Sequence, residues 1–119
     1  MKKIILILGF FTTLLFSSSY EDGLKAYKNS DFKTALLIFE ELALKDDLKA
    51  QSKLGFMYLY AKGVDVDFNK ALSFLEKASN KGDAEAQYHL GLIYISDLYK
   101  KQDYKKAKAL FEKATNQNH

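Results

Sequence analysis

The sequence contains no cysteine, proline, tryptophan or arginine, and only two histidines among its 119 residues. The absence of cysteine excludes disulfide scaffolds, thiol nucleophiles, cysteine-ligated zinc, iron–sulfur clusters and lipid attachment through an N-terminal cysteine. The absence of proline removes a common helix breaker and favours an all-helical fold. Because all 18 basic residues are lysine, bidentate recognition of phosphate or carboxylate is disfavoured.

The remaining composition is typical of one globular domain, with 48% hydrophobic and 28% charged residues. The net charge of +3 falls to +1 without Lys2 and Lys3, because 16 other lysines then face 15 acidic residues. We therefore expect no nucleic-acid partner. Two histidines are too few for a histidine-based metal site, and the titratable residues form no convergent set, so we expect neither a cofactor nor a catalytic site.

Residues 1–19 have the three-part layout of a secretory signal peptide. Lys2 and Lys3 are followed by a stretch without charge, Ile4 to Phe16, and then by three serines. As a helix this stretch spans about 20 Å, whereas the hydrocarbon core of a membrane is about 30 Å thick. We therefore predict cleavage near Ser19 and a periplasmic or secreted protein. The alternative is an uncleaved anchor, the one route by which we expect membrane contact.

The rest of the chain, residues 20–119, repeats with a period of 36 residues. Two blocks of sequence share this period, and each is about as long as a helix. The matching segments are 31–35, 67–71 and 103–107 for one block, and 50–58 and 86–94 for the other. One shared period predicts a helical hairpin that is repeated three times. The predicted units span about 20–46, 47–82 and 83–119.

Apolar residues recur at helical spacing within each block, as Ala50, Leu54 and Met57 do. Gly82 can adopt the left-handed conformation that ends a helix, and Asp83 can then cap the next helix. Asp31, Asp67 and Asp103 stand at equivalent helix starts. The predicted helices span 20–29, 31–45, 47–61, 67–80, 83–97 and 103–116.

Gly55 and Gly91 fall in the middle of predicted helices, where glycine costs about 1 kcal/mol relative to alanine. We expect this cost to be offset by packing, because a glycine allows the two helices of a hairpin to approach closely. The expected facing residues are Ala71 and Ala107. Large side chains then fill the surrounding space, namely Tyr58, Tyr94, Phe39 and Phe111.

The pattern Leu54-Gly55-x-x-Tyr58, followed by Lys70-Ala71, resembles the Sel1-like repeat, a relative of the tetratricopeptide repeat. Leu90-Gly91-x-x-Tyr94 and Lys106-Ala107 repeat it. Ala61 replaces the usual first loop glycine. The first unit is shorter and resembles an ordinary tetratricopeptide hairpin, since 12 residues separate Gly23 from Ala35 and 16 separate Gly55 from Ala71.

The resemblance implies an α-solenoid of about three antiparallel hairpins, and the predicted signal peptide implies that it is exported. The resemblance also implies a concave face, lined by the first helices, that holds an unidentified protein or peptide. By the resemblance, the groove residues are Ser52, Phe56, Leu59, Tyr60, Tyr88, Leu92 and Ile95. For each of these residues the alternative is packing against the neighbouring repeat. The sequence leaves the oligomeric state open.

Two rival functions remain alternatives to a non-enzymatic binding scaffold. Ser30 and Lys33 match the Ser-x-x-Lys pattern of penicillin-recognising enzymes, and some cysteine-rich Sel1-like proteins carry β-lactamase labels. A chain with this many lysines is expected to contain about one such match by chance. Ser30 and Asp31 also stand where a helix cap belongs, and the cysteines of the β-lactamase-labelled proteins are absent. We therefore expect no enzyme. The other rival is a structural component of envelope assembly. We expect His89 to be a partly exposed surface residue and not a metal ligand.

Overall fold

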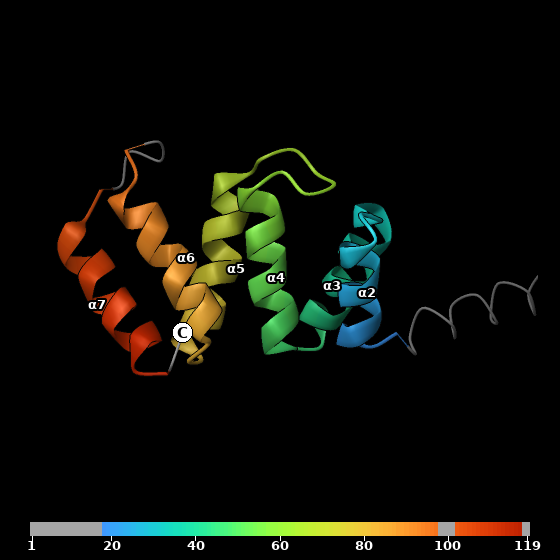
Figure 1. The fold of residues 1–119 in the computed structure, drawn as a ribbon, viewed down its shortest axis with the longest axis horizontal. Coiled ribbons are helices and arrows are strands. Elements are labelled where there is room, and N and C mark those ends of the chain that lie inside the picture. Colours follow the sequence, from blue (N-terminus) through green and yellow to red (C-terminus); the bar gives the residue numbers. More distant parts are fainter. Residues whose placement is uncertain (1–17, 98–101, 118–119) are drawn as a thin grey trace, which may run out of the picture.

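The computed structural model describes residues 18–97 and 102–117, and within these ranges it contains six helices and no strand (Figure 1). The predicted signal peptide lies almost wholly outside the described residues. The helices are α2 (Tyr20–Lys28), α3 (Phe32–Leu44), α4 (Leu48–Leu59), α5 (Phe68–Asn80), α6 (Ala84–Ile95) and α7 (Tyr104–Thr115). The prediction of an all-α fold is confirmed.

An aspartate caps each of the helices α3 to α7. Its carboxylate accepts a hydrogen bond from the backbone N–H three residues later, over 2.8 to 3.3 Å. These caps are Asp31, Asp47, Asp67, Asp83 and Asp103. Each satisfies a donor that the first turn of a helix leaves free, and its charge suits the helix dipole. The predicted ranges included the caps, so the observed helices begin one residue later.

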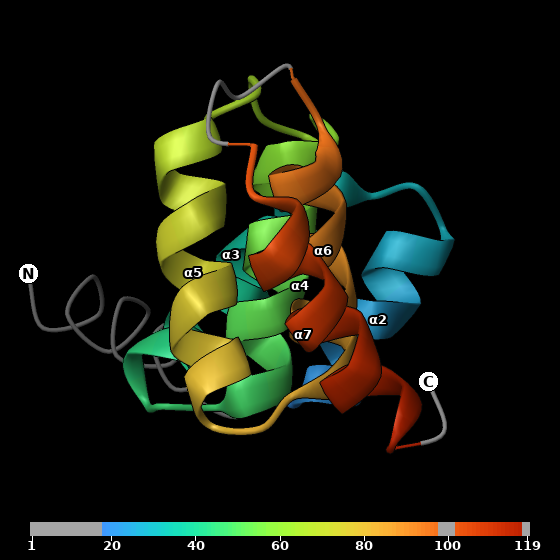
Figure 2. The same ribbon diagram turned by 90° about the vertical axis from the view of Figure 1, so that its left-hand side faces the viewer.

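The helices pair as three hairpins, α2–α3, α4–α5 and α6–α7, and consecutive hairpins meet through α3–α4 and α5–α6. Figure 2 looks along this stack, with α3 and α5 on one side and α2 and α6 on the other. Helix α4 also contacts α6, whereas among the described residues no comparable contact joins α3 to α5 or α5 to α7. The stack therefore curves with the first helices of the hairpins on its inner face.

A buried glycine in each first helix receives a large side chain from the second helix. A β-carbon on Gly91 would lie 2.6 Å from Cε1 of Phe111, and one on Gly23 would lie 2.6 Å from Cε1 of Phe39. Gly55 meets Leu75 in the same way. The expected close approach at Gly55 and Gly91 is therefore confirmed.

The facing residues differ from the expected alanines. The atoms nearest to the Gly91 position all belong to Phe111, and Ala71 contributes its backbone oxygen, 3.3 Å from the Gly55 position. Ala71 and Ala107 are themselves almost completely buried. The glycine thus makes room for a bulky residue one helical turn beyond the alanine, which fills more space than two small residues in contact would.

The four connections from α2 to α6 each use left-handed backbone, with φ 60° at Ser30 and 61° at Asp46 in the first two. Gly82 has φ +94°, as expected from its place before the Asp83 cap. In the loop after α4, Gly63 has φ +76° and Ala61 has φ 53°. Ala61 therefore adopts a backbone conformation that favours glycine, although its β-carbon makes this conformation unfavourable.

Candidate functional site on the inner face

Five rings on the inner face form a continuous series across the three hairpins, which we call the aromatic row. Its members are Tyr27, Phe56, Tyr60, Tyr88 and His89. Tyr27 comes from α2, Phe56 from α4, and Tyr60 is the C-cap of α4. Tyr88 and His89 lie on α6. Because each hairpin contributes at least one ring, stacking of the repeats assembles the row.

The rings contact one another at edge-on or tilted angles. The Phe56 ring centroid lies 6.2 Å from that of Tyr27 and 4.7 Å from that of Tyr60. The His89 ring lies 5.1 Å from Phe56, 5.8 Å from Tyr60 and 5.3 Å from Tyr88. These are the separations and orientations that aromatic pairs prefer. The row is therefore a packed surface in which neighbouring rings hold one another in place.

His89 is buried, with 8% of its surface exposed, so the prediction of a partly exposed residue is wrong. Phe56 and Tyr60 of the preceding hairpin cover its ring. Its Nε2 lies 3.9 Å from Oε1 of Glu85 on the previous turn of α6. The contact between α4 and α6 explains the difference, because a residue exposed on a single hairpin is covered once the next hairpin stacks on it.

Cationic and acidic groups flank the rings of the inner face. Lys53 Nζ lies 4.5 Å from the ring centroid of Tyr27 and 5.1 Å from that of Phe56, within range of a cation–π interaction. Near the start of α2, burial raises the pKa of Tyr20 to about 12, and nearby carboxylates add to this shift. These carboxylates belong to Glu85, Asp83, Glu21 and Asp47. Lys49 Nζ also lies 5.8 Å from the ring centroid of Tyr20, so charges of both signs lie around Tyr20, while the cation over Tyr27 is Lys53.

Exposure within the aromatic row is concentrated on two residues. Tyr60 is 42% exposed and Tyr88 is 40% exposed, whereas Tyr27 and Phe56 are half-buried. Burial is the main cause that raises the pKa of Tyr60, and the neighbouring Tyr88 adds to the shift. The Tyr60 phenol is therefore neutral near pH 7. Tyr60 and Tyr88 each offer an apolar ring together with a hydroxyl that can donate or accept a hydrogen bond.

The structure brings together three of the seven predicted groove residues, Phe56, Tyr60 and Tyr88. Ser52 is only 2% exposed and so presents almost no surface to a partner. Leu59 is partly buried against the apolar residues that α3, α4 and α5 share and against those that α5, α6 and α7 share, and Leu92 is half-buried. Ile95, 42% exposed, lines a cavity at the far end of the stack.

Sequence reasoning missed Tyr27, Lys53 and His89 as parts of this surface. Tyr27 lies four residues after Gly23, so an alignment on that glycine would have placed it on the same helix face as Leu59. His89 lies two residues before Gly91 and Lys53 two residues before Gly55. The same alignment therefore places the imidazole and the amine at one repeat position on adjacent helices.

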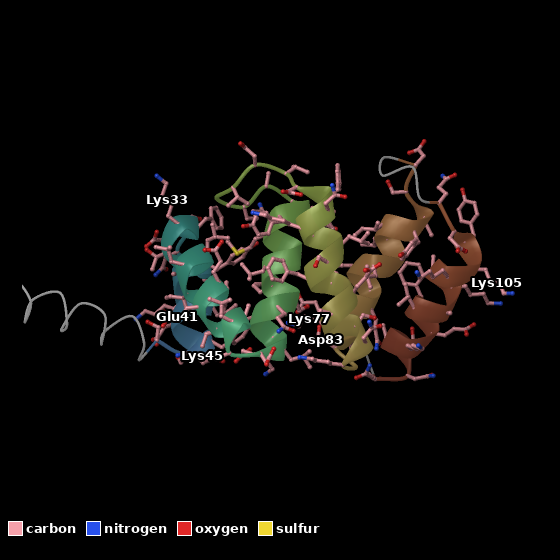
Figure 3. The ribbon with its side chains drawn as sticks, turned by 180° about the vertical axis from the view of Figure 1, so that it is seen from behind. Lys33, Glu41, Lys45, Lys77, Asp83 and Lys105 are labelled. Atoms are coloured by element: carbon pink, nitrogen blue, oxygen red, sulfur yellow. The ribbon has the colours of Figure 1, made fainter. Side chains whose placement is uncertain are left out.

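The Ser-x-x-Lys match does not form a recognisable catalytic pair. Ser30 is an exposed residue with φ 60° in the connection between α2 and α3. Asp31 caps α3, and Lys33 points outward from that helix (Figure 3). Over residues 18–97 and 102–117, no cluster of three or more acidic or histidine side chains could hold a metal ion. No helix in this part of the chain is long and apolar enough to cross a membrane.

Comparison with known proteins agrees with this architecture. A Sel1 repeat protein from Oxalobacter formigenes, known from a crystal structure, superposes with a TM-score of 0.78 at 27% sequence identity. The match covers 85% of this chain and 42% of that protein, so the chain spans less than half of its length. A search of curated proteins gave no match. The Sel1 repeat model matches residues 48–83 and 84–119, more than half of the sequence. The chain therefore belongs to the Sel1 repeat family.

Proposed function

We propose that this chain is an exported, non-enzymatic scaffold that holds a segment of a partner protein against its inner face. Sel1 repeat proteins are commonly scaffolds for protein interaction. For this chain the aromatic row is the observation that carries the proposal. It crosses all three hairpins and leaves Tyr60 and Tyr88 about two-fifths exposed.

The physical basis of the proposal is that exposed tyrosines on a rigid support are efficient interface anchors. A tyrosine loses little conformational freedom on binding and offers both apolar area and a hydroxyl group. Tyr60 and Tyr88 each contact the buried His89 ring, so their positions are restrained before a partner arrives. A preorganised surface of this kind loses less entropy on binding than a flexible one.

Export is part of the proposal and rests on the layout of residues 1–19. A positive start, an uncharged apolar stretch and a serine run together mark a secretory signal peptide. We expect the mature chain to begin at or near Tyr20 and to be recovered outside the cytoplasm. N-terminal sequencing of the protein from cell fractions tests this. A chain in the membrane pellet that still begins at Met1 would favour an anchor instead.

Site-specific photo-crosslinking tests the proposed binding face. A photoreactive phenylalanine analogue replaces Tyr88 in one variant and Leu37 in a matched control. Leu37 is 59% exposed on α3, a helix of the opposite layer (Figure 2). The expected result is one discrete protein adduct at Tyr88 and none at Leu37. Equal adducts at both positions, or an adduct at Leu37 alone, would refute binding on the inner face.

A further inference from the structure

Two equivalent cavities lie where consecutive hairpins stack, and we call them the first and the second junction cavity. The first, of about 410 Å³, is lined by residues of α3, α4 and α5 and by Asp46 in the connection between α3 and α4. The second, of about 370 Å³, is lined by residues of α5, α6 and α7. The first cavity is present although a further hairpin follows it, so such a cavity is a feature of the junction itself.

The two cavities share one framework. In each, a glutamate accepts a hydrogen bond from a tyrosine hydroxyl of the following hairpin, over 3.2 Å in the first and 3.3 Å in the second. Three lining residues of the first cavity have counterparts 36 residues later in the second: Glu40, Leu54 and Lys77 correspond to Glu76, Leu90 and Lys113. Residues that differ at matching positions therefore mark what is particular to one cavity.

The first difference is the loss of an ion pair. In the first cavity, Lys77 Nζ lies 3.5 Å from Oδ1 of Asp46. Gly82 stands where Asp46 stands one repeat earlier, so the second cavity lacks this carboxylate. Across residues 18–97 and 102–117, the ammonium group of Lys113 forms no ion pair. A cation without an ion-pair partner thus lines the second cavity.

The second difference is a lysine held in place at the second cavity. Lys106 Nζ donates a hydrogen bond to the Tyr94 hydroxyl over 2.9 Å, and this hydroxyl donates to Oε1 of Glu76. The bond to Tyr94 raises the pKa of Lys106, which keeps its amine charged. Lys70, one repeat earlier, lies over the Tyr58 ring at 5.1 Å from its centroid. An ammonium group has three N–H donors, so two remain for a ligand of Lys106.

The third difference is a polar lining at the last turn of α5. Ser79 and Asn80 line the second cavity at the positions where Ala43 and Leu44 line the first. A hydroxyl and a side-chain amide can both donate hydrogen bonds. The carbonyl oxygens of Ala78 and Ser79 accept hydrogen bonds from the backbone that follows α5, which reduces their repulsion of an anion.

We infer that the second junction cavity binds a phosphate monoester. Lys106 and Lys113 supply two cations, and Ser79 and Asn80 supply neutral donors. Lysine binds phosphate as a point charge, so the site needs no arginine. A phosphate monoester has three terminal oxygens and a charge of about −1.5 to −2, so it can accept hydrogen bonds from both α5 and α7.

The rest of the lining agrees with an ester. Glu76 is the carboxylate at this cavity, and its Oε1 already accepts the Tyr94 hydroxyl. Leu90, Ala109 and Leu110 form an apolar part of the wall, which suits an apolar substituent on the phosphate. A soluble ester and a lipid headgroup both carry this group. The site shares no residue with the aromatic row and is independent of the proposed scaffold function.

Titration of the ¹⁵N-labelled protein with phenyl phosphate tests the inference. We expect saturable shifts of the amide signals of Ser79, Asn80 and Lys113, with a dissociation constant below about 10 mM. Lys106→Gln should weaken binding about fivefold to tenfold, the effect of one hydrogen bond to a charged group. Lys70→Gln removes the corresponding lysine at the first cavity and should leave binding unchanged.

Gly82→Asp tests the missing ion pair. Asp46 has φ 61° and Gly82 has φ +94°, so an aspartate already occupies left-handed backbone at this repeat position. The new carboxylate should pair with Lys113 as Asp46 pairs with Lys77. Binding of phenyl phosphate should then weaken at least about fivefold, while circular dichroism shows an unchanged helix content.

Two further ligands identify the chemistry and its source. Benzoate has the same ring with a planar carboxylate and should bind at least about threefold more weakly than phenyl phosphate. Vesicles of phosphatidylcholine with phosphatidic acid distinguish the sources. If the source is a lipid headgroup, the wild-type protein sediments with these vesicles and Lys113→Gln does not. If it is a soluble ester, phenyl phosphate binds and the vesicles do not.

Three results would overturn the inference. The first is binding of neither phenyl phosphate nor the vesicles. The second is equal binding of benzoate and phenyl phosphate. The third is equal weakening by Lys70→Gln and Lys106→Gln, because the general positive charge of the chain would then account for the binding.

Discussion

Leu75 fills the space that a side chain on Gly55 would need. A β-carbon at Gly55 would lie 2.5 Å from Leu75 Cγ and 2.7 Å from its Cδ2, while the Ala71 carbonyl oxygen is 3.3 Å away. Leu75 is completely buried, and Gly55 belongs to the central hairpin, with a neighbour on each side. Neither the leucine nor the backbone beside it can move far without disturbing both junctions.

Gly55→Ala should therefore destabilise the protein by about 1–3 kcal/mol, although alanine is the better helix former by about 1 kcal/mol. Urea unfolding measures the change. The double variant Gly55→Ala/Leu75→Ala provides the control, because the smaller side chain makes room for the new methyl group. Its loss of stability should be smaller than the sum of the two single losses. Strictly additive losses would show that the two residues do not compete for this space.

Ala61→Gly should stabilise the protein by about 0.5–1 kcal/mol. Ala61 has φ 53°, and glycine adopts this left-handed conformation without the steric cost of a β-carbon. Ala109→Gly is the matched control, since Ala109 is exposed within α7 and the same change should cost about 1 kcal/mol there. Thermal unfolding, monitored by circular dichroism, should show a higher melting temperature for Ala61→Gly and a lower one for Ala109→Gly. A lower melting temperature for Ala61→Gly would contradict the interpretation of strain in this loop.

Alkaline pH should destabilise the protein partly through Tyr20. Burial and nearby carboxylates raise its pKa from 10.0 to about 12 in the folded state. Unfolded chains release this proton near pH 10, and folded chains hold it until near pH 12. The contribution of the Tyr20 phenol to the free energy of unfolding is therefore complete below pH 10, and it is lost as the pH rises from about 10 to about 12. Between about pH 9 and pH 11, Tyr20→Phe should lose less stability than wild type in urea unfolding. Equal losses of stability in wild type and Tyr20→Phe would contradict the raised pKa of Tyr20.

The position at which the proposed signal peptide is cleaved should affect the stability of α2. Ser19 caps this helix: its side chain accepts the Asp22 N–H over 3.2 Å, and Asp22 Oδ2 accepts the Ser19 N–H over 2.8 Å. A chain that begins at Tyr20 lacks this capping box and places a positive amino group at the helix start. We expect it to be about 1 kcal/mol less stable than a chain that begins at Ser18.

Hydrogen exchange of the α2 amides measures this difference. In the longer chain, Ser19→Ala should accelerate exchange, but less than the shorter start does, because it removes the side-chain cap without adding a positive amino group at the helix start; Ser19→Asp should preserve protection. Indistinguishable exchange in all of these chains would mean that packing alone holds α2.

Much of the fold follows from local signals in the sequence. Asp67 and Asp103 mark helix starts because a short carboxylate caps the first turn, and Gly82 marks a helix end because it tolerates positive φ. The 36-residue period then places equivalent helices without knowledge of their contacts. Family membership follows from the same pattern.

The sequence alone could not show which side chains meet between hairpins. A mid-helix glycine predicts a close approach of two helices and so favours Ala71 as the residue that faces Gly55, but the second helix places Leu75 over the glycine. Burial of His89 depends on Phe56 and Tyr60 from the preceding repeat. Leu59 packs against residues of the following hairpin, whereas Ile95, one repeat later, is 42% exposed. Each of these outcomes is set by stacking, which the pattern of one helix does not contain.

Calorimetric titration with the partner segment identified by crosslinking tests the proposed binding face most directly. Tyr60→Ala and Tyr88→Ala should each weaken binding by about 2 kcal/mol, roughly thirtyfold. Leu37→Ala should bind as wild type does, and circular dichroism should show all three variants folded. If both tyrosine variants keep the wild-type affinity while a lysine variant such as Lys105→Ala abolishes binding, the inner face is not the binding surface.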